Sequence, residues 1–325
     1  MTLRKFAALI GYSPSTVSKA FNGAADVNAE TREKILFLAK EQGVYDLFRK
    51  EKYDKKMIAV LIPETESRYY TRYVSVIGAI LSKKNASMTV SVTSFDKEKE
   101  NELINYFSSE NRSDGIITIS GGYPARKYEK VPIVYCGNAN DIYADSVNVD
   151  FFSGISETID TFKALRHKKI AFIGDVLTKT KETLFRKAME YHKIRIDEKL
   201  IVKSKTRFEE GGYDCMDKLF AANAAPTALL AAYDYLALGA IKRIEREGLS
   251  VPQDISVVGM DNTDLASHDK IGLSSIDSHH EEVCKLLVDR LFEKIERNGL
   301  TPIRKTEIKT SLVNRKTIMI AKNSL

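Results

Sequence analysis

Residues 2–23 read T-L-R-K-F-A-A-L-I-G-Y-S-P-S-T-V-S-K-A-F-N-G and predict two short helices separated by a turn. Thr2 can cap the first helix, and Gly11 can end it because a C-terminal cap usually needs a positive φ. Ser13 can then cap the second helix, with Pro14 at the first helical position, where its missing N–H costs nothing. Two helices joined in this way form a helix-turn-helix, whose second helix enters a DNA major groove.

The exposed face of the second helix is small and polar. This favours DNA binding over the alternative of a helical hairpin that packs and touches no DNA. Short hydroxyl side chains let a helix approach phosphates and base edges closely, and residues 13–22 contain one cation and no acid. For Asn22, a plain helix C-cap is an equally good interpretation. The expected DNA-binding residues are Thr2, Ser13, Pro14, Ser15, Thr16, Ser18, Lys19 and Asn22.

The same stretch resembles a known family. S-P-S-T-V-S-K-A-F-N-G at 13–23 resembles the T-V-S-R-x-x-N-G signature of the lactose/galactose repressor family, and V-N-A-E-T-R-E-K-I at 27–35 continues the resemblance. The resemblance implies that Pro14, Ser15 and Lys19 read bases. Lys19 stands where the family usually has arginine, and lysine cannot make the planar bidentate fork to guanine.

Composition sets the bounds for the rest of the chain. A length of 325 residues suggests two or three domains. Three distant cysteines without a C-x-x-C fit a reducing cytosol and argue against a disulfide framework or a zinc site. We find no secretory signal and no 18-residue apolar run, so we expect a cytoplasmic protein with no membrane partner. Residues 1–56 hold 11 Lys/Arg against 7 Asp/Glu, and thus most of the net charge of +6.

From Met57 onwards, short apolar runs alternate with helical stretches, which indicates parallel sheets covered by helices on both faces. Two such lobes would place a ligand cleft at the carboxyl ends of the strands. The expected strands are 57–62, 88–93, 115–119, 132–136, 146–149, 169–174, 227–232 and 255–260, with a last strand-like stretch at 305–313. The expected helices are 29–42 in the N-terminal part, then 70–84, 97–109, 151–165, 179–192, 209–221, 234–247 and 281–298.

The family resemblance extends over this region through I-A-V-L-I-P at 58–63 and D-I-S-V-V-G-M-D at 254–261. It implies an all-α helix-turn-helix domain followed by an α/β, two-lobed, periplasmic-binding-protein-like core with parallel sheets and three crossovers, near Ser153, Asp277 and Glu307. It also implies a homodimer, since the chain stops soon after Lys316. The expected domains are 1–46 for DNA binding, 47–56 for an atypical hinge, 57–153 with 278–306 for lobe 1, and 154–277 with 307–325 for lobe 2.

The hinge departs from the family pattern. Tyr45 is followed by Asp46 and Leu47 without the usual proline, and the stretch to Ala59 is shorter than usual. Leu47 and Phe48 could insert between base steps in the minor groove, or they could pack against the third helix. Cations in the same stretch could add phosphate contacts; these are Arg49, Lys50, Lys52, Lys55 and Lys56.

The resemblance also implies an effector site. Aromatic rings stack on the faces of sugars or bases, and a carboxylate accepts hydrogen bonds from hydroxyls. Some of the tyrosines could instead be packing residues. If Lys181 and Arg207 both face the cleft, a sugar phosphate becomes a candidate beside a neutral carbohydrate. The expected effector-binding residues are Tyr69, Tyr70, Tyr73, Phe95, Lys181, Arg207, Tyr233 and Asp261.

Catalysis has little support, because the phosphate-binding, zinc-protease and nucleophile-elbow motifs are all missing from the sequence. We expect no enzyme activity, no cofactor and no metal, and we interpret His279 and His280 as structural or cleft histidines. The leading hypothesis is a dimeric, sequence-specific repressor that binds a palindromic operator in double-stranded DNA and responds to a small molecule. The alternatives are an effector-independent DNA-binding regulator, or a cytoplasmic solute-binding protein without a DNA role.

Overall fold

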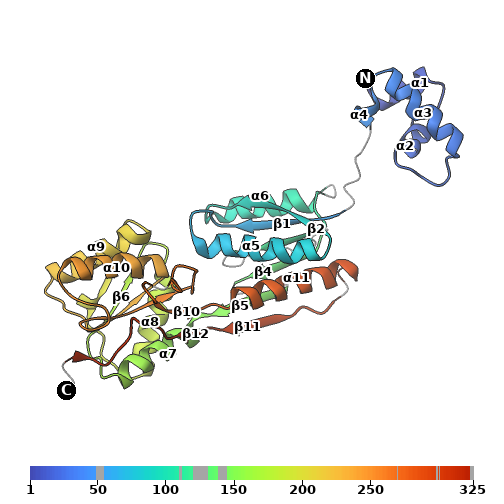
Figure 1. Cartoon of the computed structure of the whole chain (residues 1–325). Coiled ribbons are helices and arrows are strands. Elements are labelled where there is room, and N and C mark those ends of the chain that lie inside the picture. The colour runs from blue at the N-terminus through green and yellow to red at the C-terminus, as the bar shows by residue number, and fades with distance from the viewer. Residues whose placement is uncertain are drawn as a thin grey trace. The chain divides into compact units, whose positions relative to one another are not determined.

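The structure is a computed structural model and forms two compact units, Met1–Lys55 and Lys56–Leu325 (Figure 1). The second unit contains two sheets, each covered by helices, which we call lobe 1 and lobe 2. The predicted fold class, a helical N-terminal domain followed by a two-lobed α/β core, is confirmed. The structure describes residues 1–48, 55–109, 112–119, 131–137, 145–268, 270–297, 299 and 301–322.

The N-terminal unit is a small helical bundle with the predicted caps. The side-chain oxygens of Thr2, Ser13 and Asn28 each accept a hydrogen bond from the backbone N–H three residues ahead. Gly11 has a φ of +74° at the turn, a conformation that glycine adopts without strain. The predicted helix-turn-helix is therefore confirmed. The helices are α1 (Leu3–Leu9), α2 (Pro14–Phe21), α3 (Ala29–Glu41) and α4 (Tyr45–Phe48).

The end of this unit decides between the two interpretations of Leu47 and Phe48. The Phe48 ring lies 5.5 Å from that of Phe6 in α1 and 5.9 Å from that of Phe21 in α2. Phe48 therefore packs within the helical unit, where its ring contacts α1 and α2, whereas Leu47 is 66% exposed. The predicted hinge residues 49–54, with their three expected phosphate contacts, lie outside the described residues.

Lobe 1 is built on a parallel sheet with the strand order β11-β5-β4-β3-β1-β2 among the described residues. Ile58, Val60 and Ile62 pack with α5 and α11, whereas Ala59 and Leu61 pack with α6. Both faces of the sheet are thus buried, which is why β1 is apolar from Met57 to Ile62. The elements are β1 (Lys56–Ile62), α5 (Arg68–Lys83), β2 (Ala86–Val92), α6 (Lys97–Ser108), β3 (Gly115–Thr118), β4 (Ile133–Cys136), β5 (Asp145–Asp150), α11 (His280–Glu296) and β11 (Lys305–Lys309).

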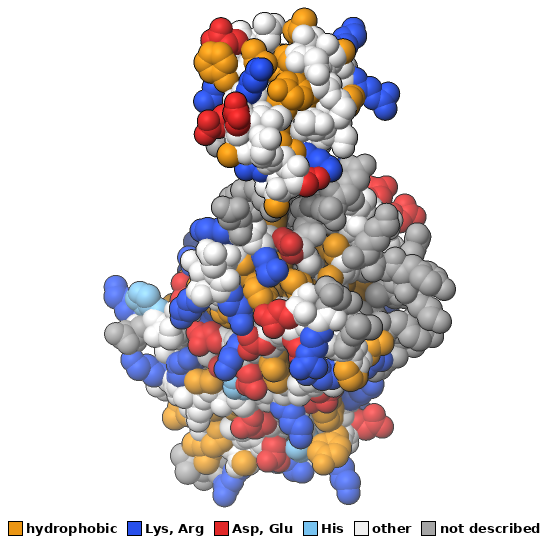
Figure 2. All heavy atoms as spheres, turned by 90° about the vertical axis from the view of Figure 1, so that its right-hand side faces the viewer, with side chains coloured by type: hydrophobic (Ala, Val, Ile, Leu, Met, Phe, Trp, Pro, Cys, Tyr) orange, Lys and Arg blue, Asp and Glu red, His pale blue; other side chains and the backbone are white. Residues whose placement is uncertain are grey.

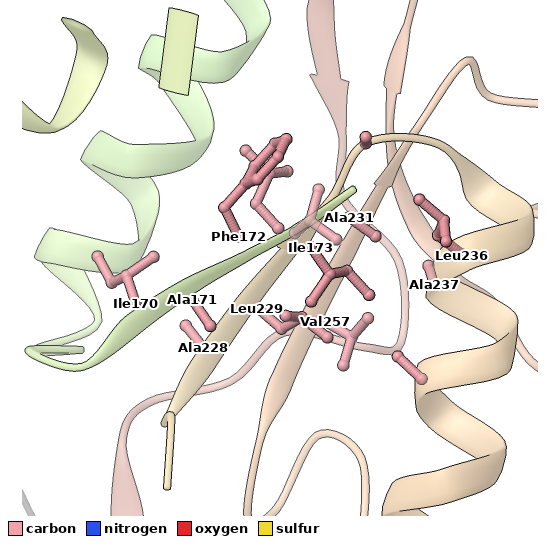
Figure 3. Close-up of a cluster of buried hydrophobic side chains, with 14 of the residues drawn as sticks. Ile170, Ala171, Phe172, Ile173, Ala228, Leu229, Ala231, Leu236, Ala237 and Val257 are labelled. Atoms are coloured by element: carbon pink, nitrogen blue, oxygen red, sulfur yellow. The ribbon is translucent and has the colours of Figure 1, made fainter. Parts of the chain in front are cut away.

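Lobe 2 has the strand order β12-β10-β9-β8-β6-β7, parallel except for β12. Figure 3 shows its core, where Phe172, Leu229 and Val257 come from three neighbouring strands and Leu236 comes from α10. The elements are α7 (Phe151–Ala164), β6 (Ile170–Gly174), α8 (Lys179–Tyr191), a short 3-10 turn η1 (Glu198–Leu200), β7 (Ile201–Lys203), α9 (Phe208–Ala221), β8 (Ala228–Ala231), α10 (Asp234–Arg246), β9 (Ser256–Met260), β10 (Ser274–Asp277) and β12 (Ser311–Val313).

The chain passes between the lobes after β5, after β10 and after β11. The last crossing is later than the expected Glu307, because β11 stays paired with β5 in lobe 1 as far as Lys309. Thr310 then joins two crossing segments. Its hydroxyl donates to the Asp150 carbonyl at 2.8 Å and accepts from the Gly154 N–H at 2.9 Å.

Two strands of lobe 2 were missed from the sequence. β7 is only three residues long, and β10 reads S-S-I-D, which lacks the apolar run of its neighbours. The serines of β10 are nevertheless fully buried, because Ser275 donates its hydroxyl hydrogen to a carboxylate and Ser274 accepts a bond from the Arg315 N–H. Among the described residues, no helix has the length and apolarity needed to cross a bilayer.

Candidate functional site

The residues predicted to contact DNA lie mainly around the start of α2. Ser13 accepts a 3.0 Å hydrogen bond from the Thr16 N–H, and the two hydroxyl oxygens lie 2.8 Å apart. At the other end, Asn22 is the C-cap, and its amide donates to the Ser18 hydroxyl at 3.3 Å. The capping interpretation of Asn22 thus has direct geometric support. The exposed members of the predicted set are Thr2, Ser13, Pro14, Ser15, Lys19 and Asn22.

Lys19 forms an ion pair with Asp26, a residue that sequence reasoning did not include. The Lys19 ammonium holds the pKa of that carboxyl below its usual value. Both side chains are about half exposed, at 49% and 58%. The signal in the sequence was the spacing: Asp26 is the first acid after α2, in the turn that brings the chain back towards α3. The cation expected to approach DNA therefore has a competing anionic partner.

Basic side chains are interspersed with acidic ones on the molecular face drawn in Figure 2, and they do not merge into one basic surface there.

In the core unit, Asp261 and Lys181 meet as an ion pair. Asp261 directly follows β9, is 4% exposed, and accepts a 3.0 Å hydrogen bond from the Lys181 ammonium. Burial raises the pKa of Asp261, and the nearby ammonium opposes that rise. Lys181 also donates to the Ala232 carbonyl at 2.7 Å and lies 4.7 Å from the Phe151 ring centroid. Two of the predicted effector residues are therefore in direct contact.

The buried carboxyl group of Asp234 holds the segment that carries Asp261. Asp234, at the start of α10, accepts hydrogen bonds from the Thr263 N–H at 2.7 Å, the Thr263 hydroxyl at 2.8 Å and the Ser275 hydroxyl at 2.5 Å. Burial, with a further contribution from Asp261, raises the pKa of Asp234 to about 7. These bonds fix the segment after β9, in which Asp261 has a left-handed φ of +92°.

Of the four predicted aromatic residues in lobe 1, three lie near one another at the carboxyl ends of its strands. The Tyr69 and Tyr70 rings lie 5.1 Å apart, and the Phe95 ring lies 5.9 Å from that of Tyr70. Tyr73 is fully buried in the core of lobe 1, so the structure supports packing for this residue and not exposure to a ligand. His280 is buried, packs 4.6 Å from Tyr73, and has its pKa lowered to about 4 by burial, which favours the structural one of the two roles expected for it.

Arg207 joins the two lobes. Its guanidinium, at the N-cap of α9 in lobe 2, makes two 2.6 Å hydrogen bonds to the carboxylate of Glu64 in lobe 1. Its Nε lies 3.8 Å from Asp175, which also accepts a 2.6 Å hydrogen bond from the Tyr233 hydroxyl. Glu64 raises the pKa of Arg207 above its usual value, so the guanidinium is fully charged.

Glu64 and Asp175 were both missed from the sequence. A signal was present, since each follows a predicted strand within two residues, at the edge where parallel sheets place their ligands. We call Glu64, Tyr69, Tyr70, Phe95, Asp175, Lys181, Arg207, Tyr233 and Asp261 the interlobe site. Within it, three carboxylates face two cations, so the site has a negative charge excess.

Known proteins resemble this chain over most of its length. Residues 159–318 match the family model described as a periplasmic binding protein-like domain. The HTH-type transcriptional regulator DegA of Bacillus subtilis (strain 168) is 31% identical over 284 residues, which cover 82% of each chain.

Solved structures share the fold. The crystal structure of the lac repressor dimer bound to operator and the anti-inducer ONPF has a TM-score of 0.70 and 24% identity, and the match covers 98% of this chain and 99% of that chain. The complex of the transcriptional regulator CelR with cellobiose has a TM-score of 0.68 and 22% identity, covering 98% and 100%. Together with the helix-turn-helix, the two-lobed core and the relation to DegA, these matches place the sequence among known regulators. The chain belongs to the lactose/galactose repressor (LacI) family of HTH-type transcriptional regulators.

Proposed function

We propose that the chain is a dimeric repressor that binds a palindromic operator through α2 and responds to a carbohydrate held at the interlobe site. The DNA-binding part of this proposal rests on one observation. The start of α2 is capped and exposed, while Val17 on the opposite side of the helix is fully buried. A recognition helix of this kind enters the major groove with its N-terminal residues against base edges. The family supports the repressor and dimer assignments, and we place the protein in the cytoplasm, with its DNA.

In this proposal the expected DNA-binding residues divide into two roles. Pro14 offers an apolar contact, which suits a thymine methyl group, and Lys19 donates to a base acceptor after leaving Asp26. The lysine ammonium is a single point charge without the planar, bidentate geometry of a guanidinium. Lys19 should therefore distinguish one base pair from another less strongly than an arginine would. Ser15 reads base edges, and the remaining residues contact phosphates or cap helices; these are Thr2, Ser13, Thr16, Ser18 and Asn22.

The charges of the interlobe site favour a neutral effector. Lys181 is paired with Asp261, Arg207 is paired with Glu64, and Asp175 is in excess. A sugar phosphate would need a cation that is not already neutralised, and it would approach three carboxylates. A neutral carbohydrate can instead donate its hydroxyls to the carboxylates and stack on Tyr69 and Tyr70. The cellobiose in the related CelR complex agrees with this ligand class.

Both lobes contribute to the site, and this gives the effector a means to act. A ligand that contacts Tyr69 of lobe 1 and Asp261 of lobe 2 binds best to one arrangement of the lobes and so shifts the population towards it. Linkage then requires that operator and effector change each other's affinity by the same factor.

The DNA-binding proposal is tested by selecting an operator from a random duplex library and measuring affinity by fluorescence anisotropy at physiological salt. We expect Lys19→Ala to lose preference for the selected operator over random DNA. Lys34→Ala, which removes an exposed cation from α3, serves as the matched control and should keep that preference. A wild-type protein that binds the selected and random duplexes alike would refute the proposal.

The effector proposal is tested by a thermal-shift screen against neutral carbohydrates and their phosphates. A ligand that binds only the folded protein stabilises it by RT ln(1 + [L]/Kd). We expect a neutral carbohydrate to raise Tm, and Asp261→Asn to abolish the shift. Since both cations of the site are already paired with the chain's own carboxylates, an effector-independent regulator is the second candidate. Specific operator binding without any carbohydrate response would support it.

A further inference from the structure

The ion pair between Glu64 and Arg207 joins two groups that are each held by their own lobe. In lobe 1, Glu64 follows Pro63, whose carbonyl accepts a 2.9 Å hydrogen bond from the Ser94 N–H. In lobe 2, the Arg207 Nε lies 3.8 Å from the buried Asp175 carboxylate. The two 2.6 Å hydrogen bonds from the guanidinium to Glu64 therefore connect one lobe to the other at a fixed point. We call this pair the interlobe link.

The backbone beside the interlobe link is strained. Phe208 directly follows Arg207 and has a left-handed φ of +57°, which is rare for a bulky residue. Its N–H donates to the Tyr233 hydroxyl at 3.0 Å, and its ring centroid lies 4.6 Å from the Arg207 guanidinium. Such residues persist only where their surroundings hold them, and they cluster at ligand clamps and switch regions. The segment that presents Arg207 to lobe 1 thus releases strain when it moves.

With the interlobe link formed, the polar groups of the interlobe site are covered. Asp261 is 4% exposed and Asp175 is 1% exposed, while the Lys181 side chain is 19% exposed. A sugar hydroxyl must come within about 3 Å of a carboxylate oxygen to donate to it, and the sugar ring needs space beside that oxygen. Carboxylates buried to this extent admit no ring unless the two lobes first move apart.

We propose that the interlobe link holds the site shut in the absence of an effector and that a carbohydrate binds only after the link has opened. The inference rests on the carbohydrate-binding role proposed above and adds the contact that controls entry. Opening leaves a carboxylate and a guanidinium without their partner. Sugar hydroxyls can serve both, because a hydroxyl is a donor and an acceptor, whereas an apolar ligand would leave both charges unpaired.

The interlobe link also sets the apparent affinity of the site. When only a fraction of the molecules is open, the apparent Kd equals the intrinsic Kd divided by that fraction. A weaker link raises the open fraction. The same rise is visible without any ligand, because Lys181 then becomes accessible to a small reagent in solution.

The test measures this access in the full chain without any carbohydrate. The protein is labelled with a trace of acetic anhydride, a small neutral reagent, and mass spectrometry gives the acetylation rate of Lys181 relative to that of the exposed Lys168. Glu64→Gln removes one charge of the interlobe link. Glu64→Asp keeps the charge and withdraws the carboxylate by one methylene, so it remains informative if Glu64→Gln does not fold. Glu66→Gln is the matched control, since Glu66 is 74% exposed and only reaches Arg207 at 4.0 Å.

We expect Lys181 to react at least about threefold faster in both Glu64 variants, as the open fraction rises, and at the wild-type rate in Glu66→Gln. Amide hydrogen exchange in β1 and β8 should stay at the wild-type rate, which would show that the lobes separate without unfolding.

Unchanged Lys181 reactivity in both Glu64 variants would overturn the proposal, and so would an equal gain in Glu66→Gln. Faster labelling together with faster exchange in β1 and β8 would also overturn it, because Lys181 would then be exposed by unfolding. No carbohydrate takes part in this experiment, so its failure is separate from a failure of the carbohydrate screen.

Discussion

At the scale of single residues, each functional surface holds its charged side chains in pairs. Lys19 is paired with Asp26 at the proposed DNA face, and Lys181 is paired with Asp261 between the lobes. The first pair is exposed, so water and salt screen it and it contributes little to folding. The second is largely buried, and leaving either partner alone would be costly. The first pair can therefore open for a ligand easily, whereas the second is part of the framework of its site.

Asp26→Asn should strengthen DNA binding. The substitution frees Lys19 and removes a negative charge that phosphates would approach, so affinity should rise for random as well as selected duplexes. The slope of log affinity against log salt concentration should steepen by about one unit, as for one extra phosphate contact. Glu33→Gln, an equal charge change at an exposed site on α3, is the control. If both variants gain equally, net charge alone explains the effect and the Lys19–Asp26 pair is irrelevant.

Asp234 should make stability depend on pH. Its pKa is raised to about 7, so the folded protein keeps a proton that the unfolded chain, with a pKa of about 3.9, releases earlier. The stability that this proton contributes is fully present below about pH 4 and is lost as the pH rises through about 7. In urea unfolding at several pH values, Asp234→Asn should therefore gain stability relative to the wild type between pH 4 and 7.

Asp254→Asn provides the comparison for this experiment. The pKa of Asp254 is lowered by its hydrogen bond with Lys322, so its contribution is lost only as the pH falls below the usual aspartate range. Its difference from the wild type should stay constant from pH 5 to 7. Parallel curves for Asp234→Asn and the wild type would contradict the shift assigned to Asp234.

At the scale of elements, the close approach of α9 and α10 depends on glycine. A Cβ atom on Gly239 of α10 would lie 1.9 Å from the Glu209 carbonyl oxygen of α9. A Cβ atom on Gly212 of α9 would lie 2.0 Å from the Leu236 carbonyl oxygen of α10. Both clashes involve backbone, which cannot rotate away. The N-terminus of α10, which carries Asp234, is positioned by this contact.

Gly239→Ala should destabilise the core by about 3 kcal/mol, because the two helices must separate to admit the methyl group. Gly78→Ala in α5 is the control. There the new Cβ would meet only the flexible end of Met88, at 2.9 Å, and the better helix propensity of alanine offsets the crowding, so stability should stay within about 1 kcal/mol of the wild type. Chemical unfolding measures both. Equal losses in the two variants would refute the close-contact explanation.

Most elements could be predicted because their periodicity and caps are local. Ser13 and Asn28 each cap a helix through a hydrogen bond to a residue only three positions away, so the start of each helix can be read from the local sequence. The apolar run of β1 is also visible in the sequence, because this strand is buried on both faces of its sheet. β10 could not be predicted, because its buried serines are tolerated only through partners distant in sequence, such as Asp234 and Arg315. The end of β11 was likewise set by pairing with β5 and not by its own residues.

At the scale of the whole core, Glu64 and Arg207 form a bidentate link between the lobes. The pair is only partly exposed, at 12% and 25%, so each charge depends on the other. Sequence reasoning found Arg207 through the family and missed Glu64, since a contact across lobes has no local pattern. The same reasoning included Tyr73, because a position carried over from the family does not reveal that this side chain is fully buried in the core of lobe 1.

A double-mutant cycle should reveal the link. Glu64→Gln and Arg207→Gln should each destabilise the core, and the double variant should lose less than the sum of the two, with a coupling of about 0.5–3 kcal/mol. Unfolding in urea measures the four free energies. Arg186→Gln combined with Glu64→Gln is the control pair, since Arg186 pairs with Glu198 elsewhere in lobe 2 and should show no coupling to Glu64. Strict additivity of Glu64 and Arg207 would show that the link contributes nothing.

The route of the chain through the two lobes has a consequence for its synthesis. The edge strands β11 and β12 lie within residues 305–313, and each completes the sheet of a different lobe. On the ribosome, neither sheet can be finished until almost the whole chain has been made, whereas the N-terminal unit is complete within its first sixth. A premature stop before Lys305 would therefore damage both lobes at once and leave the helix-turn-helix intact.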